Sequence, residues 1–124
     1  TDAAALGRAV MEGVAFAVGD CGTAIDATGT RIDRLLAVGG GARSTLWLRM
    51  IATILDRPLE VPAGGAFGAA LGACRLAMMA DGASASVAET PEIATVIEPD
   101  ATLTDAFAEG HARFRAVHQA TRTF

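Results

Sequence analysis

Three consecutive glycines, Gly39 to Gly41, interrupt the chain directly after an unbroken apolar run from Leu35 to Val38. A hydroxyl pair, Ser44 and Thr45, follows and opens a segment with the helical spacing of apolar residues. We interpret this stretch as a strand, a turn almost without side chains, and a helix. In an α/β protein such a junction is where ligands bind, because ligands lie beyond the carboxyl ends of parallel strands.

The segments on either side of the turn predict one strand–helix–strand unit. The first strand runs from about Arg34 to Val38, and its consecutive apolar residues are typical of a strand buried on both faces of a parallel sheet. The helix that follows Ser44 ends before Pro58, which cannot continue a helix, and a second short strand covers 59–61. The predicted fold class is α/β, with a short, mostly parallel sheet and packed helices.

Further helices are expected before and after this unit. The first extends from Thr1 to about Val18, with Thr1 or Asp2 as its N-cap. No linker divides the 124 residues, so we expect them to form a single unit. The other predicted elements are a polar connection over 19–30, a small-residue helix over 67–80, an irregular stretch over 83–98 and a last helix from about 103.

The composition excludes several classes of partner. The net charge is −4, so the chain lacks the basic patch that nucleic-acid binding requires. Every apolar stretch is shorter than the roughly 18 residues that cross a membrane, and the chain does not open with a basic region followed by an apolar core, as a secretory signal does. We therefore expect a cytoplasmic protein with no nucleic-acid or membrane partner.

The three glycines indicate a bound nucleotide or a related flat ligand. Without Cβ atoms the turn can adopt positive φ angles, and a flat ligand can lie directly on its peptide groups. The next helix offers unpaired N–H groups, with Ser44 as its cap or as a ligand donor. A turn with no ligand is the alternative. A Walker phosphate loop is excluded, because its GxxxxGK[ST] pattern needs a lysine that this stretch does not contain.

The dinucleotide-binding motif GxGxxG is a competing interpretation. Gly39 and Gly41 fill its first two glycine positions, and Ser44 stands at the third. Glu60 lies about 20 residues further on, where a ribose-binding acid belongs. On spacing alone, an NAD-binding Rossmann half with Glu60 on the ribose therefore stays open.

No catalytic or metal-binding group of residues is recognisable. His111 and His118 are seven positions apart on one helical stripe with Phe114 between them, which indicates packing rather than metal binding. Cys21 and Cys74 lie outside any CxxC pair and are expected to be free, buried thiols. No serine lies in a GxSxG motif either.

Four segments of the chain keep the order and spacing of a known family. They are RAVMEGVAFAV (8–18), LLAVGGGARSTLW (35–47), ATILDRPLEVP (52–62) and GAFGAALGA (65–73). Together they resemble the C-terminal part of the FGGY carbohydrate kinases, most closely the xylulokinases, over nearly the whole chain. The glycine motif with its following serine and tryptophan is the specific part of this resemblance.

The resemblance implies a fold and a site. The fold would be the two-domain ATPase type of actin and hexokinase, with a ribonuclease-H-like sheet in each domain, and residues 1–124 would be the distal part of the C-terminal, ATP-binding domain. In that family the glycine motif cradles adenosine, and Arg43 would lie in solvent or at the ribose edge. The residues implied at the adenosine site are Gly39, Gly40, Gly41, Ala42, Ser44 and Thr45.

The resemblance also implies a parent enzyme that transfers the γ-phosphoryl group of ATP, with Mg²⁺, to D-xylulose. In the family, the catalytic aspartate, the sugar-binding residues and both phosphate loops precede the matched region. No catalytic residue is therefore assigned here, and we expect this chain alone to be inactive. Its helix stripes, at 6–17 and 107–121, are expected to need partners, through a homo-oligomer or through strand-edge pairing.

Overall fold

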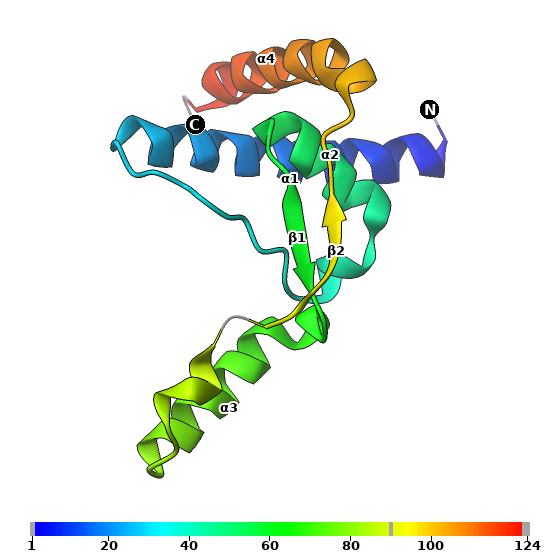
Figure 1. The fold of residues 1–124 in the computed structure, drawn as a ribbon. Helices are drawn as coiled ribbons and strands as arrows, with labels where there is room; N and C mark the ends of the chain where they lie inside the picture. Colours follow the sequence, from blue (N-terminus) through cyan, green and yellow to red (C-terminus); the bar gives the residue numbers. More distant parts are fainter. Residues whose placement is uncertain (1, 90, 123–124) are drawn as a thin grey trace.

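A computed structural model describes residues 2–89 and 91–122. In Figure 1, α1 and α4 lie at one end of a small sheet, and α3 extends away from its other end. The helices are α1 (Ala3–Ala27), α2 (Thr45–Leu55), α3 (Gly68–Ala80) and α4 (Thr104–Thr121), and the strands are β1 (Leu59–Pro62) and β2 (Ile93–Ile97). Short 3₁₀ turns are η1 (Gly40–Arg43), η2 (Gly65–Phe67), η3 (Ala85–Ala88) and η4 (Ala101–Leu103).

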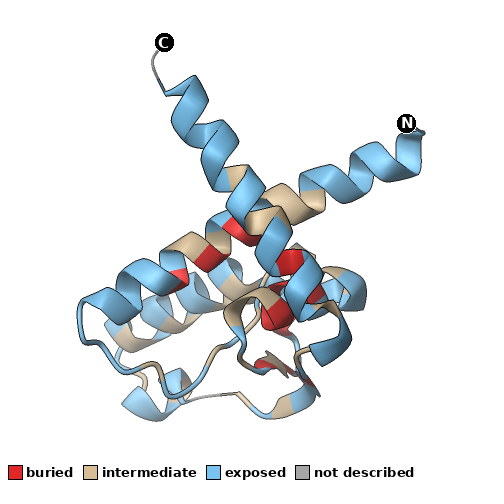
Figure 2. Ribbon diagram, turned by 90° about the horizontal axis from the view of Figure 1, so that it is seen from above, coloured by how far each residue is buried: buried red, intermediate tan, exposed pale blue. Residues whose placement is uncertain are grey.

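The core lies where α1, α2 and α4 meet. Figure 2 shows the buried positions gathered at this crossing, while the far ends of α1 and α4 are exposed. A glycine on α1 allows the close approach, because a Cβ at Gly19 would lie 2.7 Å from the Ile54 side chain of α2. The buried apolar residues are Ala15, Phe16, Leu48, Met50, Ile51, Ala52, Leu59, Ile97 and Phe107.

The first helix is longer than predicted. It begins after Asp2, whose carboxylate accepts the Ala5 N–H at 2.8 Å, and it continues to Ala27 instead of ending near Val18. The expected polar connection over 19–30 is therefore wrong over most of its length. Gly19 and Gly22 are buried against α2, and this packing offsets the roughly 1 kcal/mol that each glycine costs inside a helix. Thr1, the other predicted cap, lies outside the described residues.

The prediction of a mostly parallel sheet is also wrong. The regular sheet is the antiparallel pair β1–β2, in which Leu59 lies opposite Ile97. The expected strand over 34–38 contributes only one parallel bridge, Leu36 to Glu60. The second strand of the sheet, β2, lies far along the chain from β1. It falls within the 83–98 stretch, which the sequence predicts to be irregular.

The helices on either side of β1 end where the sequence indicates. After α2, Asp56 adopts a left-handed conformation with φ of +51°, and the chain turns into β1 at Pro58. The described part of α3 buries no residue, and α3 comes close to the 34–38 segment at Gly68, where a Cβ would lie 2.8 Å from the Val38 side chain. None of the described helices is both long and apolar enough to cross a membrane.

Contacts between α1 and α4 explain why His111 lies on the apolar stripe of α4. The His111 ring stacks on Phe16, with centroids 5.2 Å apart and planes 6° from parallel. Its Nε2 atom lies 2.9 Å from Asp20 Oδ1, and Arg115 donates to the same oxygen. The packing role predicted for His111 is confirmed, whereas the same prediction for His118 is wrong, because that residue is exposed. The expectation for the cysteines is half wrong, because Cys21 and Cys74 are free but exposed.

Candidate nucleotide-binding turn

The glycine motif forms a single turn between the 34–38 segment and α2. Gly39 has φ of +90°, a conformation that favours glycine. The chain then winds through η1, and Ser44 caps α2 by accepting the Trp47 N–H at 3.3 Å. The six residues that the sequence implies at the site are consecutive or nearly so on this turn, and the structure therefore brings them together.

Gly40 and Gly41 differ in how much space surrounds them. A Cβ at Gly41 would lie 2.2 Å from the Trp47 indole, so this glycine is needed by the packing. A Cβ at Gly40 would meet nothing within 4 Å, which leaves its peptide groups open to an approaching ligand. The turn thus has one face closed by Trp47 and another that is open.

Trp47 is itself fixed by contacts with α1. Its side chain is half-buried, and its indole Nε1–H donates to the Met11 carbonyl oxygen at 3.2 Å. This bond holds the ring in the position that excludes a side chain at Gly41. The sequence indicated the tryptophan as part of the family motif but did not indicate this supporting role, because Met11 is 36 positions away.

A second glycine-rich turn lies beside the first. The Gly39 N–H donates to the Gly65 carbonyl oxygen at 2.7 Å, and Gly64 has φ of +71°. The carboxyl ends of the 34–38 segment and β1 therefore lie together, as they do at the ligand crevice of a parallel α/β unit.

The polar groups of the turn differ in their availability. The Ser44 hydroxyl is engaged as the cap of α2, whereas Arg43 and Thr45 are exposed beside it. The start of α2 also carries the partial positive charge of a helix N-terminus. The exposed face of the turn therefore combines open peptide groups with the Arg43 guanidinium and the Thr45 hydroxyl.

Glu60 does not present a free carboxylate for a ribose. Its side chain is paired with Arg34, whose Nε donates to Glu60 Oε2 at 2.9 Å. The backbone of Glu60 is also engaged, through the bridge to the 34–38 segment. The acid that the dinucleotide alternative requires is thus already bound to a neighbouring cation.

An apolar groove of about 430 Å³ runs along the 34–38 segment and ends at the glycine turn. All of its lining side chains are apolar, so it offers no partner to a charged phosphate. We call it the apolar groove. Its lining residues are Val18, Leu35, Leu36, Ala37, Val38, Gly41, Ala42, Trp47, Leu48, Ile51, Leu55 and Leu59.

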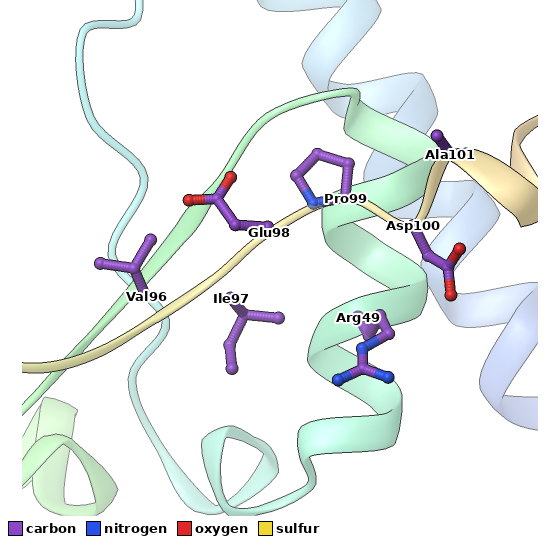
Figure 3. A pocket seen from close by; sticks show the side chains of 7 residues that line it. All are labelled: Arg49, Val96, Ile97, Glu98, Pro99, Asp100 and Ala101. Carbon is purple, nitrogen blue, oxygen red and sulfur yellow. The ribbon is translucent and has the colours of Figure 1, made fainter.

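A second hollow, of about 440 Å³, lies between α2 and the segment that joins β2 to η4 (Figure 3). It carries the guanidinium of Arg49 together with the carboxylates of Glu98 and Asp100. The pKa of Asp100 is lowered, chiefly by hydrogen bonds from the Thr102 side chain and backbone. Two carboxylates against one cation make this hollow unsuited to a nucleotide phosphate. Within 2–89 and 91–122, no cluster of three or more His, Cys, Asp or Glu could hold a metal ion.

Comparison with known proteins shows the family to which the chain belongs. Residues 1–80 match the model of the FGGY family of carbohydrate kinases, C-terminal domain. The chain belongs to the FGGY family of carbohydrate kinases. The similarity predicted from the glycine motif is confirmed, and the dinucleotide alternative receives no support from the comparisons.

The relatives that match this chain show which members of the FGGY family it resembles. The chain is 37% identical to the xylulose kinase of Escherichia coli over 117 residues, which are 92% of this chain and 24% of that protein. It is 40% identical to the xylulose kinase of Klebsiella pneumoniae over 77 residues, 62% of this chain and 16% of that protein. The chain therefore spans about a quarter or less of the curated relatives that it matches.

Solved structures of FGGY kinases agree with the fold. A crystal structure of a xylulose kinase from Brucella ovis is similar with a TM-score of 0.80 and 46% identity, over 97% of this chain and 25% of that one. The xylulose kinase from Rhodospirillum rubrum is similar with a TM-score of 0.68 and 27% identity, over 93% of this chain and 24% of that one. The architecture described above is therefore that of an FGGY sugar kinase over one quarter of its length.

Proposed function

We propose that this chain is the adenosine-binding part of an ATP-dependent sugar kinase. The observation that carries the proposal is the open glycine turn, in a chain whose residues 1–80 match the C-terminal domain of the FGGY family. Because the relatives are named xylulose kinases, we propose D-xylulose as the sugar of the whole enzyme. Residues 1–124 would be the distal part of a ribonuclease-H-like, ATP-binding domain.

The turn suits an adenine nucleotide for reasons of shape and polarity. The adenine would lie on the peptide groups of Gly39 and Gly40. The space beside Gly40 is free, because a Cβ there would meet nothing within 4 Å. Gly41 and Ala42 would line the base, Ser44 would keep the turn in shape through its cap, and Thr45 would offer its hydroxyl. Arg43, exposed at the rim, would face the ribose edge.

The whole enzyme would transfer the γ-phosphoryl group of ATP to a sugar hydroxyl, with Mg²⁺ neutralising charge on the phosphates. Such catalysis consists largely of positioning and charge stabilisation. The residues described here would contribute positioning, by holding the adenosine end of the nucleotide. The sugar would be bound by an N-terminal domain that this chain does not contain. We also propose a cytoplasmic location, where ATP is available.

Amide chemical shifts of the labelled chain, titrated with ADP, test this proposal. We expect weak binding, with shift changes centred on residues 39–45, and no phosphorylation of D-xylulose by this chain alone. Gly40→Leu should abolish the ADP-dependent shifts by filling the open face. The matched control Gly72→Leu, at another glycine with free space around it, should leave them unchanged.

The alternatives give different results in the same titration. Tight NAD binding that is lost in Glu60→Ala would replace the proposal with the dinucleotide interpretation. ADP-dependent shifts that avoid residues 39–45 would overturn the assignment of the turn. Turnover of D-xylulose by the isolated chain would contradict the division of the site between this chain and the rest of the enzyme.

A further inference from the structure

The turn that carries the glycine motif has little stiffness of its own. Its 3₁₀ segment, η1, is closed by the Ala42 N–H, which donates to Gly39 O at 3.1 Å, and by the Ser44 N–H, which donates to Gly41 O at 3.0 Å. The hydrogen bonds of a 3₁₀ turn have poorer geometry than those of an α-helix, and glycine has the widest choice of backbone conformations. A defined shape for three consecutive glycines therefore requires support from outside the turn.

Trp47 supplies this support at both ends of the 41–44 segment. Its backbone N–H donates to Ser44 Oγ at 3.3 Å, and its indole lies so close to Gly41 that a Cβ there would be 2.2 Å from the ring. It reaches the segment from the closed face, whereas the space beside Gly40 stays free. Trp47 therefore restrains the turn and leaves open the face that we propose for the adenine.

The indole is bonded in addition to α1. Its Nε1–H donates to Met11 O at 3.2 Å, and both side chains are partly buried against the core. The helix that carries Met11 packs closely on α2, because a Cβ at Gly19 or at Gly22 would lie 2.7 Å from an α2 side chain. The bond therefore joins the glycine turn to a closely packed pair of helices.

We propose that Trp47 is a positioning residue of the adenosine site: it holds the glycine turn in the shape that binds the nucleotide, without contacting the nucleotide itself. This inference rests on the proposed function, from which it takes the ligand, and it adds a residue to the six that we propose at the site. Without the bond to Met11, the turn would spend part of its time in other shapes. The apparent affinity would then fall in proportion to the fraction of molecules in the competent shape.

Trp47→Phe tests the bond to Met11, because it keeps an aromatic ring beside Gly41 and removes the Nε1–H donor. The labelled chain is titrated with ADP at a temperature at which each variant is fully folded, so that lost stability does not count as lost binding. We expect the Kd for ADP to rise about fivefold or more, as it does when a fifth of the molecules or fewer are competent. The matched control Ile51→Val shortens a buried side chain of the same helix and should leave the Kd unchanged.

Hydrogen exchange shows whether the substitution acts on the turn. Without nucleotide, the amides of Ala42 and Ser44, which close η1, should exchange about tenfold faster in Trp47→Phe than in the wild type. The Ala37 amide, bonded to Glu60 O at 2.8 Å, should keep its rate. Equal acceleration of all three amides would reduce Trp47 to a residue that stabilises the whole chain, and would contradict the positioning role.

The wild-type chain gives a second measurement, which needs no folded variant. Trp47 is the chain's only tryptophan, so a single indole N–H signal reports on the bond to Met11. Because ADP binds the shape in which this bond is made, it should slow the exchange of the indole N–H, by about tenfold at an ADP concentration roughly ten times the Kd.

The outcomes separate this inference from the proposed function. A fully folded Trp47→Phe that binds ADP with wild-type affinity would overturn the inference and leave the proposed function in place. The same holds for an indole N–H that exchanges at one rate with and without ADP. Absence of ADP binding in the wild-type chain would instead remove the proposed function, and with it the role of Trp47 at an adenosine site.

Discussion

Trp47 packs directly against Gly41, and its indole occupies the space that a side chain at position 41 would need. The tryptophan cannot move away easily, because its Nε1–H is bound to the Met11 carbonyl oxygen of α1. The shape of the glycine turn therefore depends on a helix that ends before the turn begins. A local motif in the sequence is held in place by a contact that is distant along the chain.

Gly41→Ala should destabilise the protein. A Cβ would lie 2.2 Å from Trp47 Cζ3, and overpacking of this kind costs about 1–3 kcal/mol. Urea denaturation measures the free energy of unfolding. Gly40→Ala is the matched control, because its Cβ would meet nothing within 4 Å, and it should stay within about 0.5 kcal/mol of the wild type. Equal effects at the two glycines would contradict the role given to Trp47.

Ser44→Ala should lower the free energy of unfolding by about 1 kcal/mol, because α2 loses the cap that accepts the Trp47 N–H. Thr45→Ala, at the next position and exposed, removes a hydroxyl that does not cap the helix and should have a smaller effect. Thermal unfolding followed by circular dichroism compares the two. If Thr45→Ala were the more damaging change, the cap assignment would be wrong.

Gly19→Ala and Gly7→Ala should have opposite effects although both lie in α1. Alanine favours a helix by about 1 kcal/mol over glycine, and at Gly7 nothing within 4 Å opposes it, so stability should rise. At Gly19 a Cβ would lie 2.7 Å from Ile54, and the overpacking, about 1–3 kcal/mol, should outweigh that gain. Chemical denaturation of both variants checks the sign of each change.

The α1–α4 crossing should weaken in acid. Burial raises the pKa of Asp20, but hydrogen bonds from Arg115 and His111 outweigh this and hold the pKa below its usual value of 3.8. A depressed folded pKa stabilises the fold above the unfolded value, and this contribution is lost as the pH falls through the folded value. The loss should therefore occur below pH 3.8.

The acid dependence is measured as the free energy of unfolding at a series of pH values from about 5 down to about 2. Asp20→Asn should show a shallower decline than the wild type, since it has no carboxyl to protonate at the crossing. Asp81→Asn, at the end of α3 and away from the crossing, should keep the wild-type slope. A wild-type slope in Asp20→Asn would show that other carboxylates govern the acid transition.

The parts of the fold that depend on neighbouring residues could be predicted from the sequence. The start of α2 at Ser44 and its end before Pro58 follow from capping and from proline geometry, and the structure agrees. The glycine turn could be placed for the same reason. Its six proposed ligand residues stay a prediction, because contact with a nucleotide depends on a molecule that only a binding experiment can supply.

The parts that depend on distant residues were predicted incorrectly. Gly19 resembles a helix breaker in the sequence, yet it is a close-packing position, which becomes visible only when Ile54 is placed beside it. The antiparallel partner of Leu59 is Ile97, which is 38 positions further along the chain and lies inside the 83–98 stretch that looks irregular in the sequence. The exposure of Leu36 and Val38 has the same origin, because burial of an apolar run requires a neighbour.

The hydrogen bond from Gly39 to Gly65 ties two loops into one mechanical unit. The first loop leads into α2 and the second into α3, so a displacement of α3 would pull on the peptide that begins the glycine turn. The start of α3 also packs against Val38 at Gly68, so the two glycine turns and the first turn of α3 are expected to move together.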